Sequence, residues 1–183
     1  MNVWHDINPD RITPTKFEAY IEIPKGCKSK YELDKDTGLL KLDRILYTST
    51  RDPANYGFIP RTLAQDLDPL DVLVLCSETI YPGTLVQCYP IGYIIMIDSG
   101  YKDEKIIAIP FSDPKYSAYT DISQLPSHIF KEMCHFFAVY KMLETDDKYT
   151  EVEDVKDAKE TEQIIAQAIK DYEETFGSLK KKQ

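Results

Sequence analysis

Three aspartates, Asp66, Asp68 and Asp71, lie within six residues of this chain. Two carboxylates about 4 Å apart repel each other by roughly 4 kcal/mol at an effective dielectric constant of about 20, and a third adds to that cost unless protons or cations are present. Pro69 fixes one backbone angle and removes a backbone N–H, so the segment is a shaped loop. The apolar residues 72–75 follow at once and indicate a buried strand that begins where this loop ends.

This acidic loop, residues 66–71, has two interpretations. Hard divalent cations such as Mg²⁺ prefer oxygen ligands and take a few from protein and the rest from water and phosphate. The simpler interpretation is a solvated acidic turn in front of a buried strand, which is common for short acidic motifs. Three aspartates around a proline shift the balance towards metal binding.

The composition is that of a globular protein, and we expect one domain over residues 1–183. The chain is 43% hydrophobic and 29% charged, close to the averages of globular proteins. Its net charge of −9 argues against a nucleic-acid surface, which needs a basic footprint. No apolar run reaches the roughly 20 residues of a membrane helix, and the start lacks a basic segment with an apolar core behind it. The cysteines show no C-x-x-C spacing, so we expect free thiols, a cytoplasmic location and no membrane partner.

The first two-thirds of the chain has the pattern of β-strands. Phe17, Ala19, Ile21 and Ile23 alternate with their neighbours in a period of two. A polar turn that ends at Gly38 predicts a hairpin between residues 31–33 and 39–42. Short strands at this spacing indicate a small closed barrel. The further expected strands, separated by Pro90 and by a loop over residues 98–104, are 72–76, 85–88, 91–97 and 106–109.

The last third of the chain has a helical pattern. Asp157 with Glu160 predicts the start of one helix and Gly177 its end. The fold class we expect is mainly β with α (α+β), with helices packed on the barrel. The apolar residues of the two helical faces are Ile129, Met133, Phe136, Phe137 and Tyr140, and Ala158, Ile165, Ala168, Ile169, Tyr172 and Phe176.

Other charged residues stand where the expected strands end. Each alone is most simply an exposed surface charge. Together they offer oxygen ligands rimmed by Lys and Arg, a combination that indicates phosphoryl chemistry, because metals held by carboxylates neutralise phosphate and the cations bind its remaining oxygens. The G-x-x-x-x-G-K-[ST] loop is absent, and the acidic loop is not an EF-hand, since its sixth position is Asp71 rather than glycine. These charged residues are Glu22, Lys30, Glu32, Arg44, Asp98, Asp103 and Lys105.

Stretches over nearly the whole chain resemble the family I soluble inorganic pyrophosphatases. The segment 66–72 (DLDPLDV) is similar to the signature of that family. The length is similar to that of the bacterial type. The resemblance implies a five-stranded OB-type β-barrel with flanking C-terminal helices, usually a homohexamer, that hydrolyses pyrophosphate to two phosphates. The likeness extends through residues 22–26 (EIPKG), 30–32 (KYE), 38–44 (GLLKLDR), 53–60 (PANYGFIP), 90–92 (PIG), the set Asp98, Asp103 and Lys105, and 135–141 (HFFAVYK).

The resemblance implies that five carboxylates bind several Mg²⁺ ions per subunit. Asp66, Asp71 and Asp103 would hold the activating ions. Asp98 would join Asp103 at a metal that arrives with the substrate, and Glu32 would serve another. These five residues form the expected metal set.

The resemblance also implies the remaining roles. Asp68 would be the catalytic residue that accepts a proton from the attacking, metal-activated water. Glu22 would orient metal-bound water rather than bind a metal directly. The substrate-binding residues would be Lys30, Arg44, Tyr56, Lys105, Tyr140 and Lys141.

Four residues depart from the family pattern. Leu67 stands where a small residue, commonly glycine, is usual, so we expect a difference in loop conformation. Asp52 replaces a tyrosine: it either lines the site and weakens pyrophosphate binding, or points to solvent and caps the turn before Pro53. Tyr89 takes the place of a frequent arginine. Val139 takes the place of a histidine that some relatives have at a subunit contact.

Two alternative functions remain open from the sequence. The first is a catalytically weak relative that acts as a phosphate- or metal-binding protein, which an activity assay with Mg²⁺ would distinguish. The second is an OB-type oligonucleotide binder, in which bases would stack on Tyr and Phe. The acidic charge balance argues against the second alternative.

Overall fold

Strand β1 (Phe17–Ile23) is hydrogen-bonded along both edges, and this closes a ring of strands. In the computed structural model, which describes residues 2–98, 100–144 and 150–177, β1 pairs with β4 (Asn55–Phe58) and with β6 (Leu85–Asp98). Strands β5 (Asp71–Val74) and β7 (Tyr101–Pro110) complete the ring in the order β1-β4-β5-β7-β6. Its pairs are antiparallel except for β5 with β7. The mainly β fold with a five-stranded ring is confirmed.

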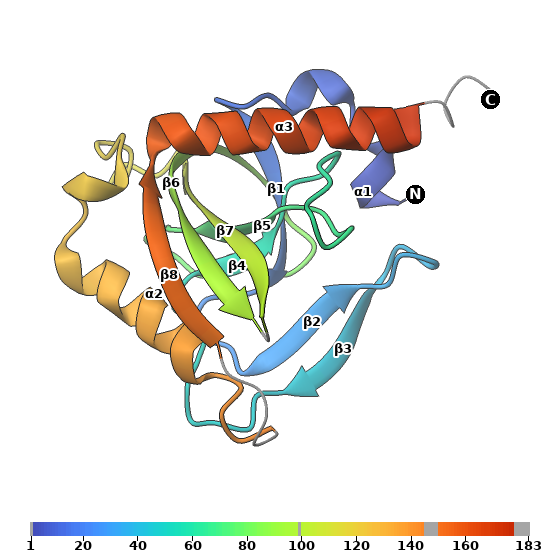
Figure 1. Ribbon diagram of the computed structural model, residues 1–183. Coiled ribbons are helices and arrows are strands. Elements are labelled where there is room, and N and C mark those ends of the chain that lie inside the picture. Colours follow the sequence, from blue (N-terminus) through green and yellow to red (C-terminus); the bar gives the residue numbers. More distant parts are fainter. Residues whose placement is uncertain (1, 99, 145–149, 178–183) are drawn as a thin grey trace.

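A separate hairpin stands beside the ring (Figure 1). It consists of β2 (Ser29–Leu33) and β3 (Leu40–Ile45), paired antiparallel as a two-stranded sheet. The turn ends at Gly38, whose φ of +73° lies in the left-handed region that glycine adopts without a steric penalty. The predicted hairpin is therefore confirmed.

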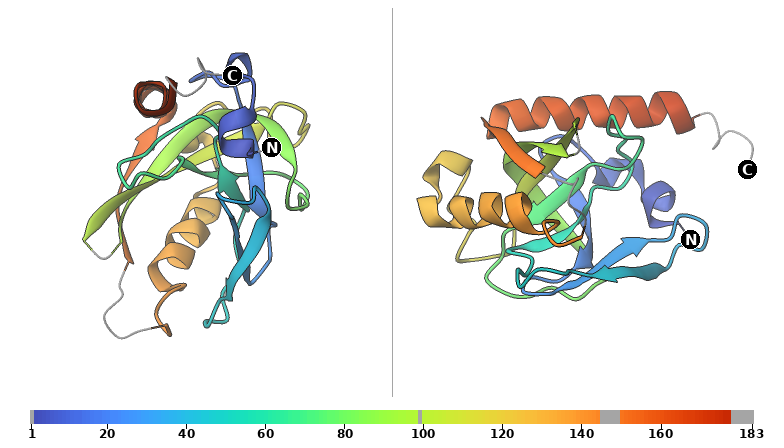
Figure 2. Two further views of the ribbon diagram at one scale, coloured as in Figure 1. Left: turned by 90° about the vertical axis from the view of Figure 1, so that its right-hand side faces the viewer. Right: turned by 60° about the horizontal axis from the view of Figure 1, so that its bottom comes forward.

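Two helices pack on the outside of the strands. Figures 1 and 2 show α3 (Ala158–Phe176) lying across one end of the ring, while α2 (Ser127–Val139) runs along another side. The Asp157 side chain accepts a hydrogen bond from the Glu160 backbone N–H at 2.8 Å, which starts α3 as predicted. Among the described residues, no helix is long and apolar enough to cross a membrane. The short elements are α1 (Val3–Asp6) and the 3₁₀ turns η1 (Pro9–Arg11) and η2 (Ile122–Gln124).

The strand predictions need two corrections. Residues 98–104 are not a loop, because β6 and β7 form one long hairpin in which Asp98 pairs with Tyr101. Pro90 does not separate two strands either: it lies within β6 at a register irregularity, where a missing backbone donor interrupts the ladder only locally.

The last third is not purely helical, which is a further correction. Strand β8 (Thr150–Asp157) precedes α3 and pairs antiparallel with the outer part of β6. Five of its eight residues are charged, so its pattern of hydrophobicity is weak. The polar sequence of this segment therefore did not predict a strand.

Strand β5 is buried on both faces and contributes to two of the three apolar clusters found among the described residues. Val72 and Val74 pack into a cluster that includes Ile165 and Ala168 of α3. Leu73 faces the other way, into a cluster that contains apolar side chains of α2. A strand buried on both faces reads as a continuous apolar run, which explains the sequence after the acidic loop.

Glycine is required at one close approach in the ring. A Cβ atom on Gly57 of β4 would lie 1.8 Å from the backbone oxygen of Tyr20 in β1. No side chain fits in that space, so the β1–β4 pairing depends on this residue. Tyr56, the neighbour of Gly57, is directed into the cleft described next.

Candidate active site

One cleft of about 410 Å³ is lined by all thirteen residues predicted for the site. The ring supplies its wall, the β2–β3 hairpin and the acidic loop supply two sides, and the end of α2 supplies a third. The structure therefore brings together residues that lie up to 119 positions apart in the sequence. They are Glu22, Lys30, Glu32, Arg44, Tyr56, Asp66, Asp68, Asp71, Asp98, Asp103, Lys105, Tyr140 and Lys141.

Lys105 is the centre of this cleft. The parallel register of β5 and β7 sets Lys105 opposite Asp71, and Asp103 lies two residues earlier on the same face of β7. The buried ammonium group forms ion pairs with Asp71 and, at 2.8 Å, with Asp103, and it donates a hydrogen bond to the Tyr56 hydroxyl at 3.1 Å. Burial opposes the charge, but the attraction of Asp71 and then of Asp103 outweighs it and raises the pKa of Lys105. The lysine stays charged and holds the two carboxylates in place.

The aromatic residues around Lys105 keep their protons. Desolvation, followed by the negative charge of Asp71, raises the pKa of Tyr56. Burial likewise raises the pKa of Tyr140, although Lys105 and Lys141 act in the opposite direction. Both hydroxyls are therefore neutral near pH 7 and available as hydrogen-bond donors.

Three further carboxylates of the cleft are also paired with lysines. Lys30 contacts Glu32, Lys35 contacts Asp68, and Lys141 lies 2.5 Å from Asp98. Within the described residues, no three carboxylate, histidine or cysteine side chains already form a metal-ligand cluster. The acidic groups of the expected metal set nevertheless face one cleft, and their donors are all oxygens. This chemistry fits Mg²⁺, because a divalent cation can take over the neutralising role of the lysines.

The acidic loop is held in a specific shape rather than as a loose turn. The Asp68 backbone N–H donates to an Asp66 carboxylate oxygen at 3.1 Å, and the Ala64 N–H donates to the Asp68 carbonyl oxygen at 2.7 Å. Leu67 has a φ of +69°, in the left-handed region that non-glycine residues rarely adopt. This geometry explains why a glycine suits the position, and Leu67 occupies it with an exposed side chain.

Glu22 lies at the inner end of the cleft. It is buried, and one of its carboxylate oxygens accepts a hydrogen bond from the Leu33 N–H at 2.7 Å. Burial raises the pKa of Glu22 to about 8, although the Leu33 N–H acts to lower it. Glu22 thus joins β1 to the hairpin and presents a carboxyl group that is mostly protonated at pH 7.

Three contacts in the cleft were not foreseen from the sequence. Lys35 reaches Asp68 from the hairpin turn, 33 positions away. Arg44 is held by Glu144 at 2.7 Å and by Asp43 at 2.5 Å. Asp43 is the sequence neighbour of Arg44, but no periodicity or motif connects Lys35 with Asp68 or Arg44 with Glu144, so only the fold reveals those two contacts.

Asp52 does not point to solvent. Only 6% of its surface is exposed, and its side chain lies behind the cleft beside Tyr56 and Tyr140. The interpretation of Asp52 as a solvent-facing cap of the turn is therefore wrong.

Comparisons with known proteins agree with this arrangement. The family model for inorganic pyrophosphatase matches residues 19–173. The chain is 46% identical over 173 residues to soluble inorganic pyrophosphatase 2 of Chlamydomonas reinhardtii, covering 94% of this chain and 89% of that protein. It is 54% identical over 144 residues to soluble inorganic pyrophosphatase PPA1 of Solanum tuberosum, covering 79% and 68%. The crystal structure of inorganic pyrophosphatase from Thermus thermophilus superimposes with a TM-score of 0.85 at 37% identity, covering 87% of this chain and 92% of that one.

Proposed function

The chain belongs to the inorganic pyrophosphatase family, and from that premise we propose that it hydrolyses pyrophosphate to two phosphates in the cleft around Lys105. The enzyme is an inorganic diphosphatase, which cleaves a phosphoric anhydride bond. One observation carries the assignment of the site: the residues expected for metal binding, substrate binding and proton transfer all line one cleft. A protein that only binds phosphate or metal is not favoured, because the relatives are named as enzymes.

The cationic side chains of the cleft suit a substrate with several negative charges. Lys30, Arg44, Lys105 and Lys141 line it, and each is currently paired with a carboxylate. A lysine released from its carboxylate binds a phosphoryl oxygen through a charge-assisted hydrogen bond. Tyr56 and Tyr140, which remain protonated, donate further hydrogen bonds to the phosphates.

We assign metal binding to the expected metal set. Asp66, Asp71 and Asp103 would hold activating Mg²⁺, with Asp98 and Glu32 at further ions. When bound, Mg²⁺ neutralises phosphate charge and lowers the pKa of the attacking water.

Asp68 is our candidate for the proton acceptor. Its side chain is about half exposed and contacts the ammonium of Lys35, so it reaches the open part of the cleft. Water adds to one phosphorus, the P–O–P bond breaks, the second phosphate leaves, and Asp68 takes the proton of the water. Positioning and charge neutralisation supply most of the catalysis in phosphoryl transfer, so this residue needs no further activation.

The proposal extends to the setting of the enzyme. We propose residues 1–183 as one catalytic domain that forms a homohexamer in the cytoplasm. The four free cysteines support a reducing compartment. A light-scattering mass of six chains at micromolar concentration is expected, and a mass of one chain would refute the assembly.

A phosphate-release assay tests the proposed function. We expect rapid release from pyrophosphate with Mg²⁺, poor release with Ca²⁺, which is larger and has a looser coordination geometry, and none with excess EDTA. Full activity in EDTA would contradict the metal assignment. No release at any Mg²⁺ concentration would contradict the function itself.

A further inference from the structure

Asp52 occupies a small cavity of its own behind the cleft. The cavity has a volume of about 30 Å³ and shares Lys30, Tyr56 and Tyr140 with the cleft. This volume is enough for one water molecule. The carboxyl group is therefore buried next to residues that we expect to bind substrate, although it does not line the cleft directly.

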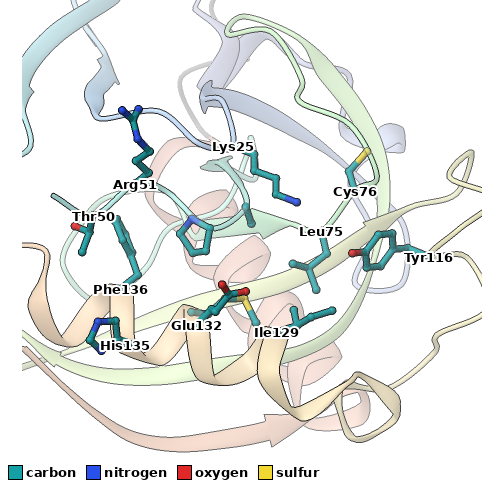
Figure 3. Close-up of a pocket in the computed structure, with 13 residues that line it drawn as sticks. Lys25, Thr50, Arg51, Leu75, Cys76, Tyr116, Ile129, Glu132, His135 and Phe136 are labelled. Carbon is teal, nitrogen blue, oxygen red and sulfur yellow. The ribbon is translucent and has the colours of Figure 1, made fainter.

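The backbone fixes the direction of the Asp52 side chain. Its N–H donates to the Cys27 carbonyl at 3.0 Å, and its own carbonyl accepts from the Gly26 N–H at 2.8 Å. The neighbours Arg51 and Pro53 line a second pocket of about 390 Å³ against α2 (Figure 3). The segment 50–54 therefore lies between this pocket and the cavity that contains Asp52. Asp52 alone in this segment faces the inner cavity.

Few groups near Asp52 can balance its charge. Lys30 faces the cavity from β2, Tyr56 from β4 and Tyr140 from the end of α2, and the rest of the lining is apolar. The Arg51 guanidinium donates to the Gly26 carbonyl at 3.0 Å and does not line this cavity. Among the described residues that line this cavity, Lys30 is the one cation that faces the carboxyl group.

The protonation of Asp52 changes near neutral pH. Burial raises its pKa to about 7, and the positive charge of Lys30 acts in the opposite direction. The carboxyl group is thus mainly neutral at pH 6 and mainly ionised at pH 8.

We propose that Asp52 is a positioning residue for Lys30 and makes the affinity for pyrophosphate pH-dependent, an inference that rests on the proposed function. The ionised carboxylate attracts Lys30 and lowers the positive potential at the phosphate site. The neutral carboxyl group does not compete with the substrate for Lys30, whose other carboxylate partners are Glu32 and, at 3.7 Å, Asp43. Affinity should therefore fall as pH rises, through a charge that never touches the substrate.

The first test compares the wild type with Asp52→Asn, which keeps the shape and removes the titration. KM for pyrophosphate is measured at saturating Mg²⁺ from pH 6 to pH 8.5 and low ionic strength. We expect the ratio of wild-type KM to variant KM to rise about 3- to 10-fold over this range, with the ratio of kcat values constant. Dividing the wild-type KM by the variant KM cancels the effect of substrate and metal titration, which is the same for both proteins. A constant KM ratio would overturn the proposal.

The second test needs no activity and separates this proposal from the proposed function. In the metal-free protein, ¹³C NMR follows the titration of the carboxyl groups, and the titration that is absent in Asp52→Asn is that of Asp52. The midpoint should move to higher pH in Lys30→Met, because the positive charge that favours ionisation is gone. An unmoved midpoint would refute the coupling even if the enzyme is active. The ratio of wild-type KM to the KM of Asp52→Tyr should rise over this pH range as it does for Asp52→Asn, because neither variant has the titrating carboxyl group; a constant ratio would also refute the proposal.

Discussion

Two pockets of nearly equal volume, the cleft around Lys105 and the second pocket against α2, differ in charge rather than in size. The cleft around Lys105, about 410 Å³, is lined by seven acidic and five basic side chains. The second pocket, about 390 Å³, has a mostly apolar lining (Figure 3). Its charged or titratable side chains are Lys25, Arg51, Glu132 and His135, together with Cys76 and Tyr116. Volume alone would not identify the site. Crowded like charges, which cost stability, mark the cleft as functional.

The ion pairs of the two pockets differ in the same way. Glu132 lies 3.7 Å from His128 on the exposed face of α2, and a pair of this kind contributes little. Lys105 is buried between Asp71 and Asp103, where removal of one partner leaves an uncompensated charge. Substitutions in the cleft should therefore have large effects and matched ones in the second pocket small effects.

The largest expected effect is that of Asp68→Asn. Loss of the proposed proton acceptor should lower kcat by about 10²- to 10⁴-fold, with metal binding largely intact. The matched control is Glu132→Gln, which removes one carboxylate from the second pocket and should leave kcat unchanged. Equal losses in both variants would break the contrast between the pockets.

Asp71→Asn should act on metal rather than on kcat. It removes a proposed Mg²⁺ ligand, and we expect the Mg²⁺ concentration for half-maximal activity to rise by at least about 10-fold, because even the loss of an outer-shell partner of a ligand costs about 10- to 100-fold in metal affinity. Magnesium titrations of Asp71→Asn and Asp68→Asn separate the two roles. The same metal deficit in both variants would show that the roles are misassigned.

Asp52→Asn should change stability in a pH-dependent way. The pKa of Asp52 in the folded state, about 7, lies above the ordinary 3.8. Below pH 4 the carboxyl group is neutral in both states and adds no ionisation penalty, and the wild type loses stability as pH rises from about 4 to 7. Each unit of difference between the folded and unfolded pKa is worth about 1.4 kcal/mol, and relaxation around the ionised group reduces the total. We therefore expect the free energy of unfolding of the variant to exceed that of the wild type by about 1–3 kcal/mol at pH 8. Thermal melts at pH 4.5 and pH 8 measure this; an equal gain at both would contradict it.

Leu67→Gly should have the smallest effect. It relieves a left-handed backbone conformation that costs a non-glycine residue about 1–2 kcal/mol, but glycine also gains entropy in the unfolded chain. A net stabilisation below about 1 kcal/mol in urea unfolding is expected. A destabilisation would mean that the exposed leucine makes a contribution that the backbone angle does not reveal.

The ring, the hairpin and the start of α3 could be predicted because their signals are local. The alternation in β1, the glycine turn of the hairpin and the capping residue Asp157 each act within a few positions. The site followed from charge crowding and from resemblance to a family, and the fold brings those residues to one cleft.

The remaining features could not be predicted because their causes are not local. Strand β8 is stabilised by pairing with β6 and not by its own weak pattern. Pro90 is tolerated in β6 because the ladder is already irregular there. Lys35 neutralises Asp68 only because the hairpin turn lies next to the acidic loop. The direction of Asp52 is set by hydrogen bonds to residues 26 and 27.

The charged sequence of β8 has a consequence for how the protein behaves in a crowded solution. Within the described part of the chain, β8 pairs only with β6, so its other edge offers free backbone donors and acceptors. Glu151, Glu153 and Asp154 are exposed along it. A strand from another molecule would have to place its backbone against these like charges, which disfavours runaway edge-to-edge growth. The weak hydrophobic pattern that concealed this strand in the sequence is the same property that protects it from forming aggregates.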